Sequence, residues 1–400
     1  MRTACERISD KTKVYPASIF FLLLCIFSAC SGTHLPLDPV RENKPGEGEF
    51  SWTSPLPVHS SFVYGSVGCA EKYHVFTDGR GFAKRHASRA LRASTGEWYT
   101  GRFVGKSITG DIFESGEKSF QGTSSTTSGL LEAITIDVGW GDAHLLVLPG
   151  GGLVLIDCGS HEHLNDLRTF LDERVPSSPS GSLQAIVLTH PHEDHIGGAI
   201  DVLETYPVDQ LLLPEVDPAD FPLLASIVDK AVVSGVPVRF LTRGENNVNS
   251  PLSLGWDPEL GVAVLNSGLL NGSGNPNNFS VVMKVSFGEI DLLFTGDAEE
   301  EVEKQLLFEY TGSDYLSCEV LKLAHHGSND ANTPDFLEAV SPRVALLSIN
   351  PREVGWSLPG SDVLATLDYL MVDLFRTDFP GCEGSHISVL TDGKYIEVSQ

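Results

Sequence analysis

Thr189-His190-Pro191-His192-Glu193-Asp194-His195-Ile196-Gly197-Gly198 is the stretch that decides the fold of this chain. It holds three of the chain's 13 histidines and one aspartate in the spacing H-x-H-x-D-H. The apolar segment 183–188 before it predicts a buried strand. Pro191 keeps His190 out of the helical region, so the cluster begins as a loop before a helix near 194–195. Because neutral imidazoles and carboxylates bind zinc, iron and manganese, the stretch predicts a metal site, and a solvated polar loop is the weaker alternative.

The composition indicates a large folded core and argues against polyanionic partners. The chain has 400 residues, 41% of them hydrophobic, enough for one large domain or about two or three small ones. Its formal net charge of −26 argues against strong binding of nucleic acid or of anionic lipid surfaces. A positively charged metal site would still accept a small anion.

Residues 1–30 have the layout of a bacterial export signal. Basic residues precede an apolar run, 17–27, that is too short to span a bilayer as a helix. The run ends in Phe27-Ser28-Ala29-Cys30, which resembles a lipobox with Phe27 at the usual leucine position, so Cys30 is the expected lipidation site. Secretion with cleavage after Ser31 and an uncleaved anchor are the alternatives. All three place the rest of the chain outside the cytoplasm, and in the first the lipid is the only membrane contact.

The rest of the chain divides into three segments. Residues 31–58, rich in Pro, Gly, Ser and Glu, predict a flexible tether. Residues 59–128 predict a small N-terminal segment of unassigned role, either an accessory module or an extension packed on the main domain. Residues 130–399 alternate strands and helices, which predicts an α/β (α+β) domain with helices outside its sheets. The expected strands are 62–64, 98–104, 133–138, 144–148, 153–156, 211–213, 237–241, 262–266, 279–287 and 290–295, and the expected helices are 82–93, 163–173, 195–205 and 219–233.

Two further strand ends in the last segment carry metal-ligand residue types. Asp297 stands in a Thr-Gly-Asp turn after an apolar strand, where its commoner role is to cap a following helix, here 299–310. His325 and His326 follow the strand 319–323, and two adjacent histidines rarely face the same ligand. His326, directly before a glycine, is the first choice as ligand and His325 the second.

Together these motifs resemble the metallo-β-lactamase fold hydrolases, and within them the metallo-hydrolase domain of ComEC-type competence proteins. The resemblance extends from residue 130 to about 399. The motifs that carry it are, in chain order, Asp137-Val138-Gly139-x-Gly141-Asp142-Ala143, Leu155-Ile156-Asp157-x-Gly159, the histidine cluster, Asn277-Asn278-x-Ser280, Thr295-Gly296-Asp297 and Leu321-Lys322-x-x-His325-His326-Gly327-Ser328.

The resemblance implies a four-layer αββα sandwich with two divalent metal ions at one edge, zinc first, with manganese or iron as alternatives. The implied ligands are His190 and His192 for one ion, Asp194, His195 and His326 (or His325) for the other, and Asp297 between them. Asp194 and Asp297 would also be the catalytic carboxylates. Asp142 and Asp157 would orient histidines or, equally, hold backbone turns.

Two departures from the family bear on the substrate. No histidine lies between His195 and His325, where many members have one more ligand, which argues against a true β-lactamase. Leu358 stands where a histidine is usual. The expected function is extracytoplasmic hydrolysis of a small-molecule or polymer phosphodiester by a metal-bridging hydroxide. The alternatives are hydrolysis of a lactam, lactone or thioester, and a non-catalytic surface-binding lipoprotein.

Overall fold

The structure is a computed structural model, and the residues that it describes are 41–42, 49–67, 73–76, 83–122, 129–243, 254, 256–268, 274–350, 357–378 and 386–400. All of them belong to the compact unit Asp38–Gln400. The expected signal peptide, the lipidation site Cys30 and most of the expected tether lie outside the described residues. Within the described ranges, no helix is long and apolar enough to cross a membrane.

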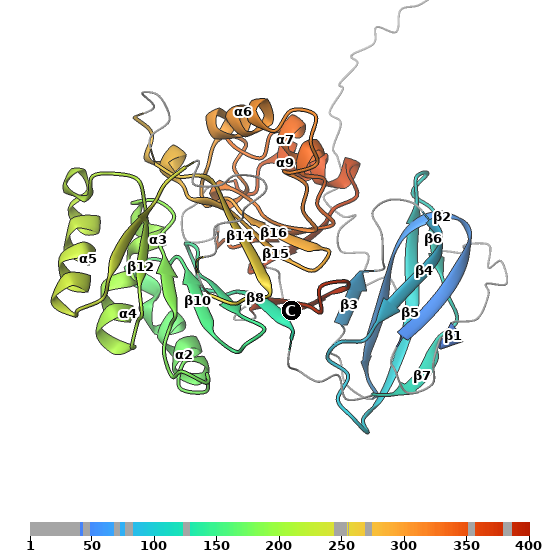
Figure 1. Ribbon diagram of the computed structural model, residues 1–400. Helices are drawn as coiled ribbons and strands as arrows, with labels where there is room; N and C mark the ends of the chain where they lie inside the picture. Colours follow the sequence, from blue (N-terminus) through green and yellow to red (C-terminus); the bar gives the residue numbers. More distant parts are fainter. Residues whose placement is uncertain are drawn as a thin grey trace, which may run out of the picture. The chain divides into compact units, whose positions relative to one another are not determined.

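Two mixed sheets form the main domain (Figure 1). In the part of the chain that the structure describes, the first sheet contains β8 (Leu131–Thr135), β9 (His144–Val147), β10 (Leu153–Ile156), β11 (Ala185–Val187), β12 (Leu211–Pro214), β13 (Val238–Leu241), β20 (Ile387–Thr391) and β21 (Ile396–Ser399). The second contains β14 (Leu260–Asn266), β15 (Val282–Phe287), β16 (Ile290–Phe294), β17 (Val320–Lys322), β18 (Val344–Leu347) and β19 (Asp373–Arg376).

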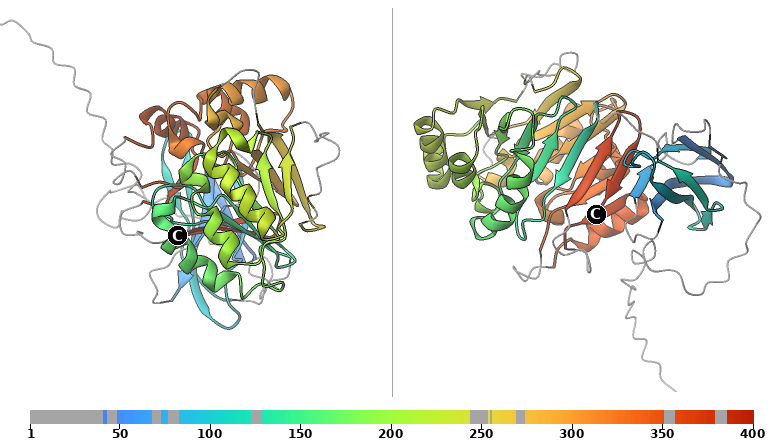
Figure 2. Two further views of the ribbon diagram at one scale, coloured as in Figure 1. Left: turned by 90° about the vertical axis from the view of Figure 1, so that its left-hand side faces the viewer. Right: turned by 90° about the horizontal axis from the view of Figure 1, so that it is seen from below.

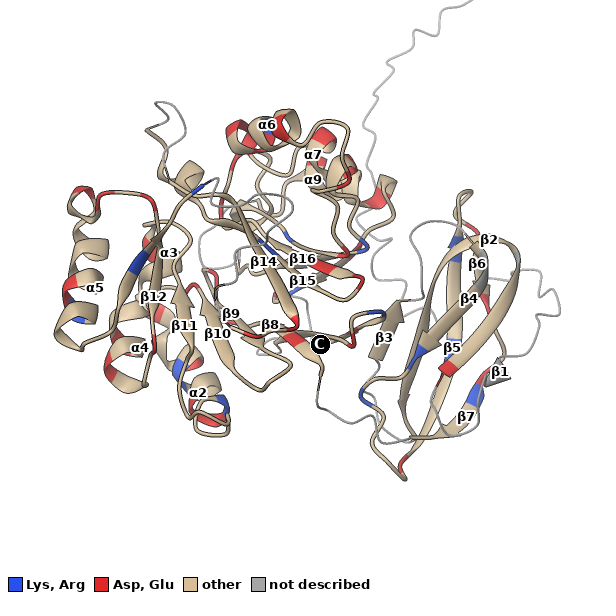
Figure 3. Ribbon diagram, viewed as in Figure 1, with Lys and Arg blue, Asp and Glu red and all other residues tan. Residues whose placement is uncertain are grey.

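Helices cover the outer face of each sheet, and the two views in Figure 2 show the resulting layers. On the first sheet lie η1 (His161–His163), α2 (Leu164–Arg174), α3 (Glu193–Ile196), α4 (Ala199–Thr205), η2 (Pro218–Asp220) and α5 (Pro222–Val233). On the second lie α6 (Glu300–Glu309), α7 (Pro334–Val340) and α9 (Ser361–Tyr369). The short turns η3 (Pro276–Phe279) and η4 (His325–Gly327) precede β15 and follow β17. Many of the acidic residues, coloured red in Figure 3, lie on these outer helices, and others lie in loops and strands.

Three apolar clusters hold the layers together, and β10 shows how the sequence builds them. Val154 and Ile156 pack between the two sheets, whereas Leu153 and Leu155 pack under the helices of the first sheet. Successive side chains of a strand point to opposite faces, so a strand buried on both sides needs a continuous apolar run. The order helix, sheet, sheet, helix is the αββα sandwich that the sequence predicted.

Parallel pairing brings the functional loops to one edge. The strands β10, β11 and β12 are parallel neighbours, as are β16, β17 and β18. The carboxyl ends of parallel strands lie at the same edge, where α/β proteins place their ligand sites. The histidine cluster follows β11, Asp297 follows β16, and the His325–His326 pair follows β17.

The N-terminal segment consists of strands: β1 (Arg41–Glu42), β2 (Glu49–Ser66), β3 (Tyr73–Phe76), β4 (Ala83–Arg89), β5 (Trp98–Ser107), β6 (Ile112–Glu114) and β7 (Lys118–Gln121). Two sequence predictions are wrong here. Residues 49–58 are not tether but the first half of β2, because Phe50 and Trp52 alternate with more exposed residues and are buried. Residues 83–89 are not helical, because they pair antiparallel with β2, and a strand neighbour overrides local helix propensity.

This segment extends the first sheet of the main domain. The strand β3 pairs antiparallel with β21, with Phe76 opposite Ile396. The Tyr64 hydroxyl donates to the buried Glu397 carboxylate at 2.6 Å. The Arg92 guanidinium lies 3.1 Å from the Glu132 carboxylate and 3.2 Å from that of Glu397. The pairing covers an edge strand that would otherwise expose unpaired backbone groups.

Candidate metal centre

Asp157 fixes the start of the histidine loop. Its carboxylate accepts hydrogen bonds from the Thr189 backbone N–H and from the Thr189 hydroxyl, both at 2.7 Å. The same carboxylate lies 2.8 Å from Nδ1 of His195. Asp157 therefore holds a backbone turn and orients a histidine at once, so the two roles that the sequence left open for it occur together.

His195 lies at the middle of the site and is fully buried. Because the Asp157 carboxylate lies against Nδ1 of His195, the other ring nitrogen, Nε2, points to Asp297 and lies 3.2 Å from its Oδ2. Asp142 also approaches from the Nδ1 side, at 3.8 Å. The helix α3, Glu193–Ile196, carries His195 into this position. The sequence predicted one helix over 195–205, and the structure divides it into α3 and α4 at Gly197–Gly198.

Asp297 gathers the histidines around one of its oxygens. Its Oδ2 lies 3.2 Å from Nε2 of His195 and 3.8 Å from Nε2 of both His190 and His326. The Asp297 backbone N–H donates to the Ser280 hydroxyl at 3.0 Å. The helix that follows begins at Glu300 with Glu299 as its N-terminal cap residue, so the alternative role of Asp297 as a helix cap is wrong.

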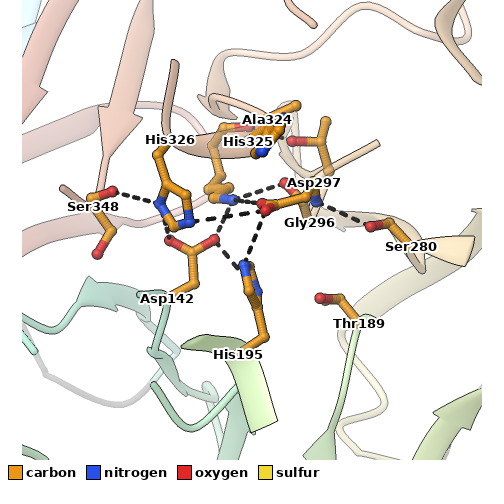
Figure 4. Close-up of polar contacts among 12 residues, drawn as sticks. Asp142, Thr189, His195, Ser280, Gly296, Asp297, Ala324, His325, His326 and Ser348 are labelled. Carbon is orange, nitrogen blue, oxygen red and sulfur yellow. Dashed lines mark hydrogen bonds and ion pairs between the residues drawn. The ribbon is translucent and has the colours of Figure 1, made fainter. Parts of the chain in front are cut away.

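The adjacent His325 and His326 point in different directions (Figure 4). Both have a φ of +47°, which turns the chain sharply before Gly327. His326 is buried, its Nε2 lies 3.2 Å from Asp194, and its Nδ1 lies 3.0 Å from the Ser348 carbonyl oxygen that can accept its proton. His325 is 23% exposed and lies 3.4 Å from the Glu299 carboxylate. Of the two, the structure brings His326 into the centre.

His192 stays at the margin of the site. It is half-buried, and its Nδ1 lies 3.1 Å from Nε2 of His190. Among the described residues, the groups with converging ligand atoms are His190, His195 and Asp297, then Asp194, His195 and His326, and then Asp142, Asp157 and His195. His192 belongs to none of these three.

Lys322 stands in one of the motifs quoted above, but the sequence analysis assigned it no role in the centre. It ends β17 and is 2% exposed. Its ammonium forms an ion pair with Asp142, lies 3.4 Å from Oδ1 of Asp297, and donates to the Gly296 carbonyl at 2.7 Å. A lysine between two leucines of a parallel strand was the available signal, because such strands are normally apolar on both faces.

Two other predicted positions lie close by. The Asn278 side-chain oxygen accepts the Glu299 N–H at 3.1 Å, and the Asn277 side chain donates to the Glu299 carboxylate at 2.7 Å. Leu358 is half-buried, and its neighbour Gly360 donates its backbone N–H to the Gly327 carbonyl at 2.8 Å. Leu358 therefore stands beside the turn that carries the two histidines.

Burial and charge move the pKa values of the histidines in opposite directions. Burial lowers the pKa of His190 well below its usual value, and the neighbouring His195 adds to this. Burial also lowers the pKa of His195, but the carboxylates of Asp297 and Asp157 outweigh it and raise that pKa well above the usual value. Burial raises the pKa of Asp297, but His195, His326 and Lys322 together hold it well below its usual range. An imidazolium at His195 thus supplies positive charge that a bound cation would replace.

The donor set fits divalent metal ions. In each of the converging groups, the ligand atoms lie within 4.8 Å of one another. Nε2 of His195 is buried and lies 3.2 Å from Oδ2 of Asp297, in an ion pair and not in a well-aligned hydrogen bond. A divalent ion held between this ring nitrogen and this carboxylate oxygen would have the ligand types that zinc prefers. The residues that would hold ions are His190, Asp194, His195, Asp297 and His326, and imidazole with carboxylate suits zinc.

Comparisons with known proteins show which family of proteins has a similar sequence. The family model described as the metallo-beta-lactamase superfamily matches residues 138–349. ComE operon protein 3 of Bacillus subtilis (strain 168) is 27% identical over 266 residues, which are 62% of this chain and 32% of that protein. Recombination protein 2 of Haemophilus influenzae is 28% identical over 235 residues, 58% of this chain and 26% of that protein. The chain thus spans about a third or less of these relatives' length.

A solved structure is also similar. Zinc-bound PqqB from Methylobacterium extorquens aligns with a TM-score of 0.37 at 13% sequence identity, over 62% of this chain and 97% of that one.

Proposed function

The chain belongs to the metallo-β-lactamase superfamily, as its motifs predicted, and from this premise we propose that it is an extracytoplasmic hydrolase that uses two divalent ions to cleave a phosphodiester. The observation that supports the proposal is the convergence of three histidine Nε2 atoms on one oxygen of Asp297. Two ions in such a centre activate water near neutral pH and stabilise the oxygens of an in-line displacement.

The protein's own groups prepare this centre. Asp157 fixes the tautomer of His195 by accepting from Nδ1, which leaves Nε2 free to bind an ion. The Ser348 carbonyl does the same for His326, and Asp194 approaches its Nε2 from the opposite side. Because these partners are buried and fixed before any ion binds, little rearrangement opposes binding.

Charge favours a small phosphodiester over a long nucleic acid. The net charge is −26, and the acidic residues are spread over the helices and loops around both sheets (Figure 3). A long polyanion needs a basic surface that neutralises many phosphates at once. A single phosphodiester needs only the local positive charge of the ions.

The first experiment measures metal content and turnover together. We expect about two ions per chain by elemental analysis and metal-dependent hydrolysis of bis(p-nitrophenyl) phosphate. Asp297→Asn should abolish turnover and lose metal, whereas Asp229→Asn, on the exposed face of α5, should change neither. Wild-type protein that carries no metal after growth in zinc- and manganese-supplemented medium would refute the proposal.

One observation favours a second substrate class. Leu358, which packs against the apolar core of the second sheet, stands where the resembled family usually has a histidine, so the site lacks that imidazole as a proton donor for a leaving group. A protein with two ions that hydrolyses lactone, lactam or thioester substrates but not the phosphodiester would establish this alternative. Failure on all these substrates, with little metal, would favour a binding lipoprotein.

We propose that the protein is anchored through lipid on Cys30. The support is the sequence Phe27-Ser28-Ala29-Cys30 after a short apolar run. Metabolic labelling with an alkyne fatty acid should mark the wild type and not Cys30→Ser. Equal labelling of the two would contradict the anchor.

A further inference from the structure

We propose that Lys322 is a positioning residue of the metal centre, whose ammonium holds Oδ1 of Asp297 so that Oδ2 alone faces the histidines. The inference rests on the proposed metal-dependent function and assigns a role to a residue that is not itself a ligand. Its basis is the set of contacts that Lys322 makes at the end of β17, and Figure 4 labels its three partners, Asp142, Gly296 and Asp297.

The ammonium of Lys322 has no donor to spare for a substrate. A lysine ammonium has three N–H donors. The structure gives it three acceptors, the carboxylates of Asp142 and Asp297 and the carbonyl oxygen of Gly296. The side chain is 2% exposed. Lys322 therefore acts through the carboxylates that it holds and not by contact with a reacting molecule.

The two oxygens of Asp297 have separate surroundings. Oδ1 lies 3.4 Å from the Lys322 ammonium, whereas Oδ2 lies within 3.8 Å of the Nε2 atoms of three histidines. Without the ammonium, the carboxylate would be free to rotate, and either oxygen or both would turn toward the ions. The Ser280 hydroxyl holds only the backbone of Asp297, so it does not fix this rotation.

Lys322 also holds the carboxylate of Asp142, which lies on the Nδ1 side of the two histidines His195 and His326. Asp142 is fully buried, and it lies 3.8 Å from Nδ1 of both His195 and His326. Asp142, Lys322 and Asp297 thus form a continuous carboxylate–ammonium–carboxylate bridge behind the centre. A bridge of this kind keeps two buried acids paired before any ion is bound, when an unpaired buried charge would be most costly.

The charge of the centre is consistent with this role. With neutral histidines, the carboxylates of Asp142, Asp157, Asp194 and Asp297 are opposed by Lys322 alone, which leaves three uncompensated negative charges. Two divalent ions and one hydroxide would neutralise them. A centre without the lysine would keep a net negative charge, which opposes the approach of an anionic substrate.

A second buried lysine provides a matched control. Lys284 in β15 is 6% exposed, donates to the carbonyls of Tyr315 and Ser317 at 2.9 Å, and pairs with Asp291 at 2.7 Å. Its contacts are of the same kind as those of Lys322, but none of them belongs to the centre. Replacing either lysine by methionine removes a buried ammonium, and only Lys322→Met also releases Asp297.

The test measures zinc affinity of the full chain by competition with a chromophoric chelator, and the melting temperature with and without zinc. Lys322→Met should weaken zinc binding about 10- to 100-fold and shrink the zinc-induced rise in melting temperature. Lys284→Met should lower the melting temperature of the metal-free protein but leave zinc affinity within about twofold of wild type.

Unchanged zinc affinity in Lys322→Met would overturn the inference, and so would tighter binding, which would mean that the lysine competes with an ion. If Lys322→Met does not fold, the double variant Lys322→Met/Asp142→Asn is used, because it removes the two opposite charges together. Its zinc affinity is compared with that of Asp142→Asn, and the double variant should bind zinc more weakly. If the wild type binds no metal, the proposed function itself is refuted. If the wild type and Lys322→Met bind zinc equally well, only the role of Lys322 is refuted.

Discussion

Replacing Asp157 with asparagine is expected to weaken both the fold and the metal centre. The carboxylate accepts three hydrogen bonds, from the Thr189 N–H, the Thr189 hydroxyl and Nδ1 of His195. An asparagine in the same place keeps one acceptor oxygen and presents an N–H₂ group to the other two partners. Two charge-assisted hydrogen bonds then become weaker neutral ones, at about 1–1.5 kcal/mol each, so the free energy of unfolding should fall by about 2–3 kcal/mol.

The effect on metal binding follows from the tautomer of His195. Facing an amide N–H₂, the ring is stable with Nδ1 as acceptor and the proton on Nε2, the atom that points to Asp297. A protonated Nε2 cannot bind an ion. Zinc affinity should therefore fall about 10- to 100-fold, the usual cost of removing a partner that orients a ligand.

Urea unfolding of the metal-free protein and chelator competition for zinc measure the two effects separately. The matched control is Asp257→Asn, because the Asp257 carboxylate also accepts two backbone N–H groups, from Gly150 at 2.7 Å and Glu259 at 2.9 Å, away from the centre. The control should lose stability but keep its zinc affinity. Asp157→Asn with wild-type zinc affinity would show that the orientation of His195 does not matter for binding.

Three further predictions concern the ligands and pH. His326→Ala should lose metal by elemental analysis whereas His325→Ala should keep it, because only His326 faces Asp194; the reverse result would exchange their roles. Asp297 and Asp157 raise the pKa of His195 in the metal-free protein, so an ion that binds this histidine must displace a proton. Zinc affinity measured by chelator competition should therefore rise with pH until the raised pKa is passed. A zinc affinity that does not change with pH would contradict this prediction. Burial raises the pKa of Glu303 from 4.5 to about 6, so its protonation stabilises the fold below about pH 4.5 and that contribution, up to about 2 kcal/mol, is lost as pH rises through 6. Metal-free Glu303→Gln should lack this loss in urea unfolding at pH 4.5 and 7.5, and a parallel decline in both proteins would refute it.

The sequence by itself determined the fold class and the centre's main residues. His190, Asp194 and His195 lie within six residues of one another in the chain, so their proximity is a local property of the sequence. The apolar runs at β11 and β16 marked buried strands, and the residues directly after them necessarily lie at a sheet edge. Periodicity failed in the N-terminal segment, because the pairing of β2 with β4 depends on a partner strand and not on the residues of 83–89.

Only the tertiary structure decided which groups meet. Asp194 and His326 are 132 residues apart in sequence and 3.2 Å apart in space, because packing the two sheets face to face brings the ends of β11 and β17 together. The same packing chose His326 over His325 and placed Lys322 against Asp297. A sequence pattern records which side chains reach a strand end. Their distances across the sandwich depend on side-chain volumes throughout the core, which no local pattern contains.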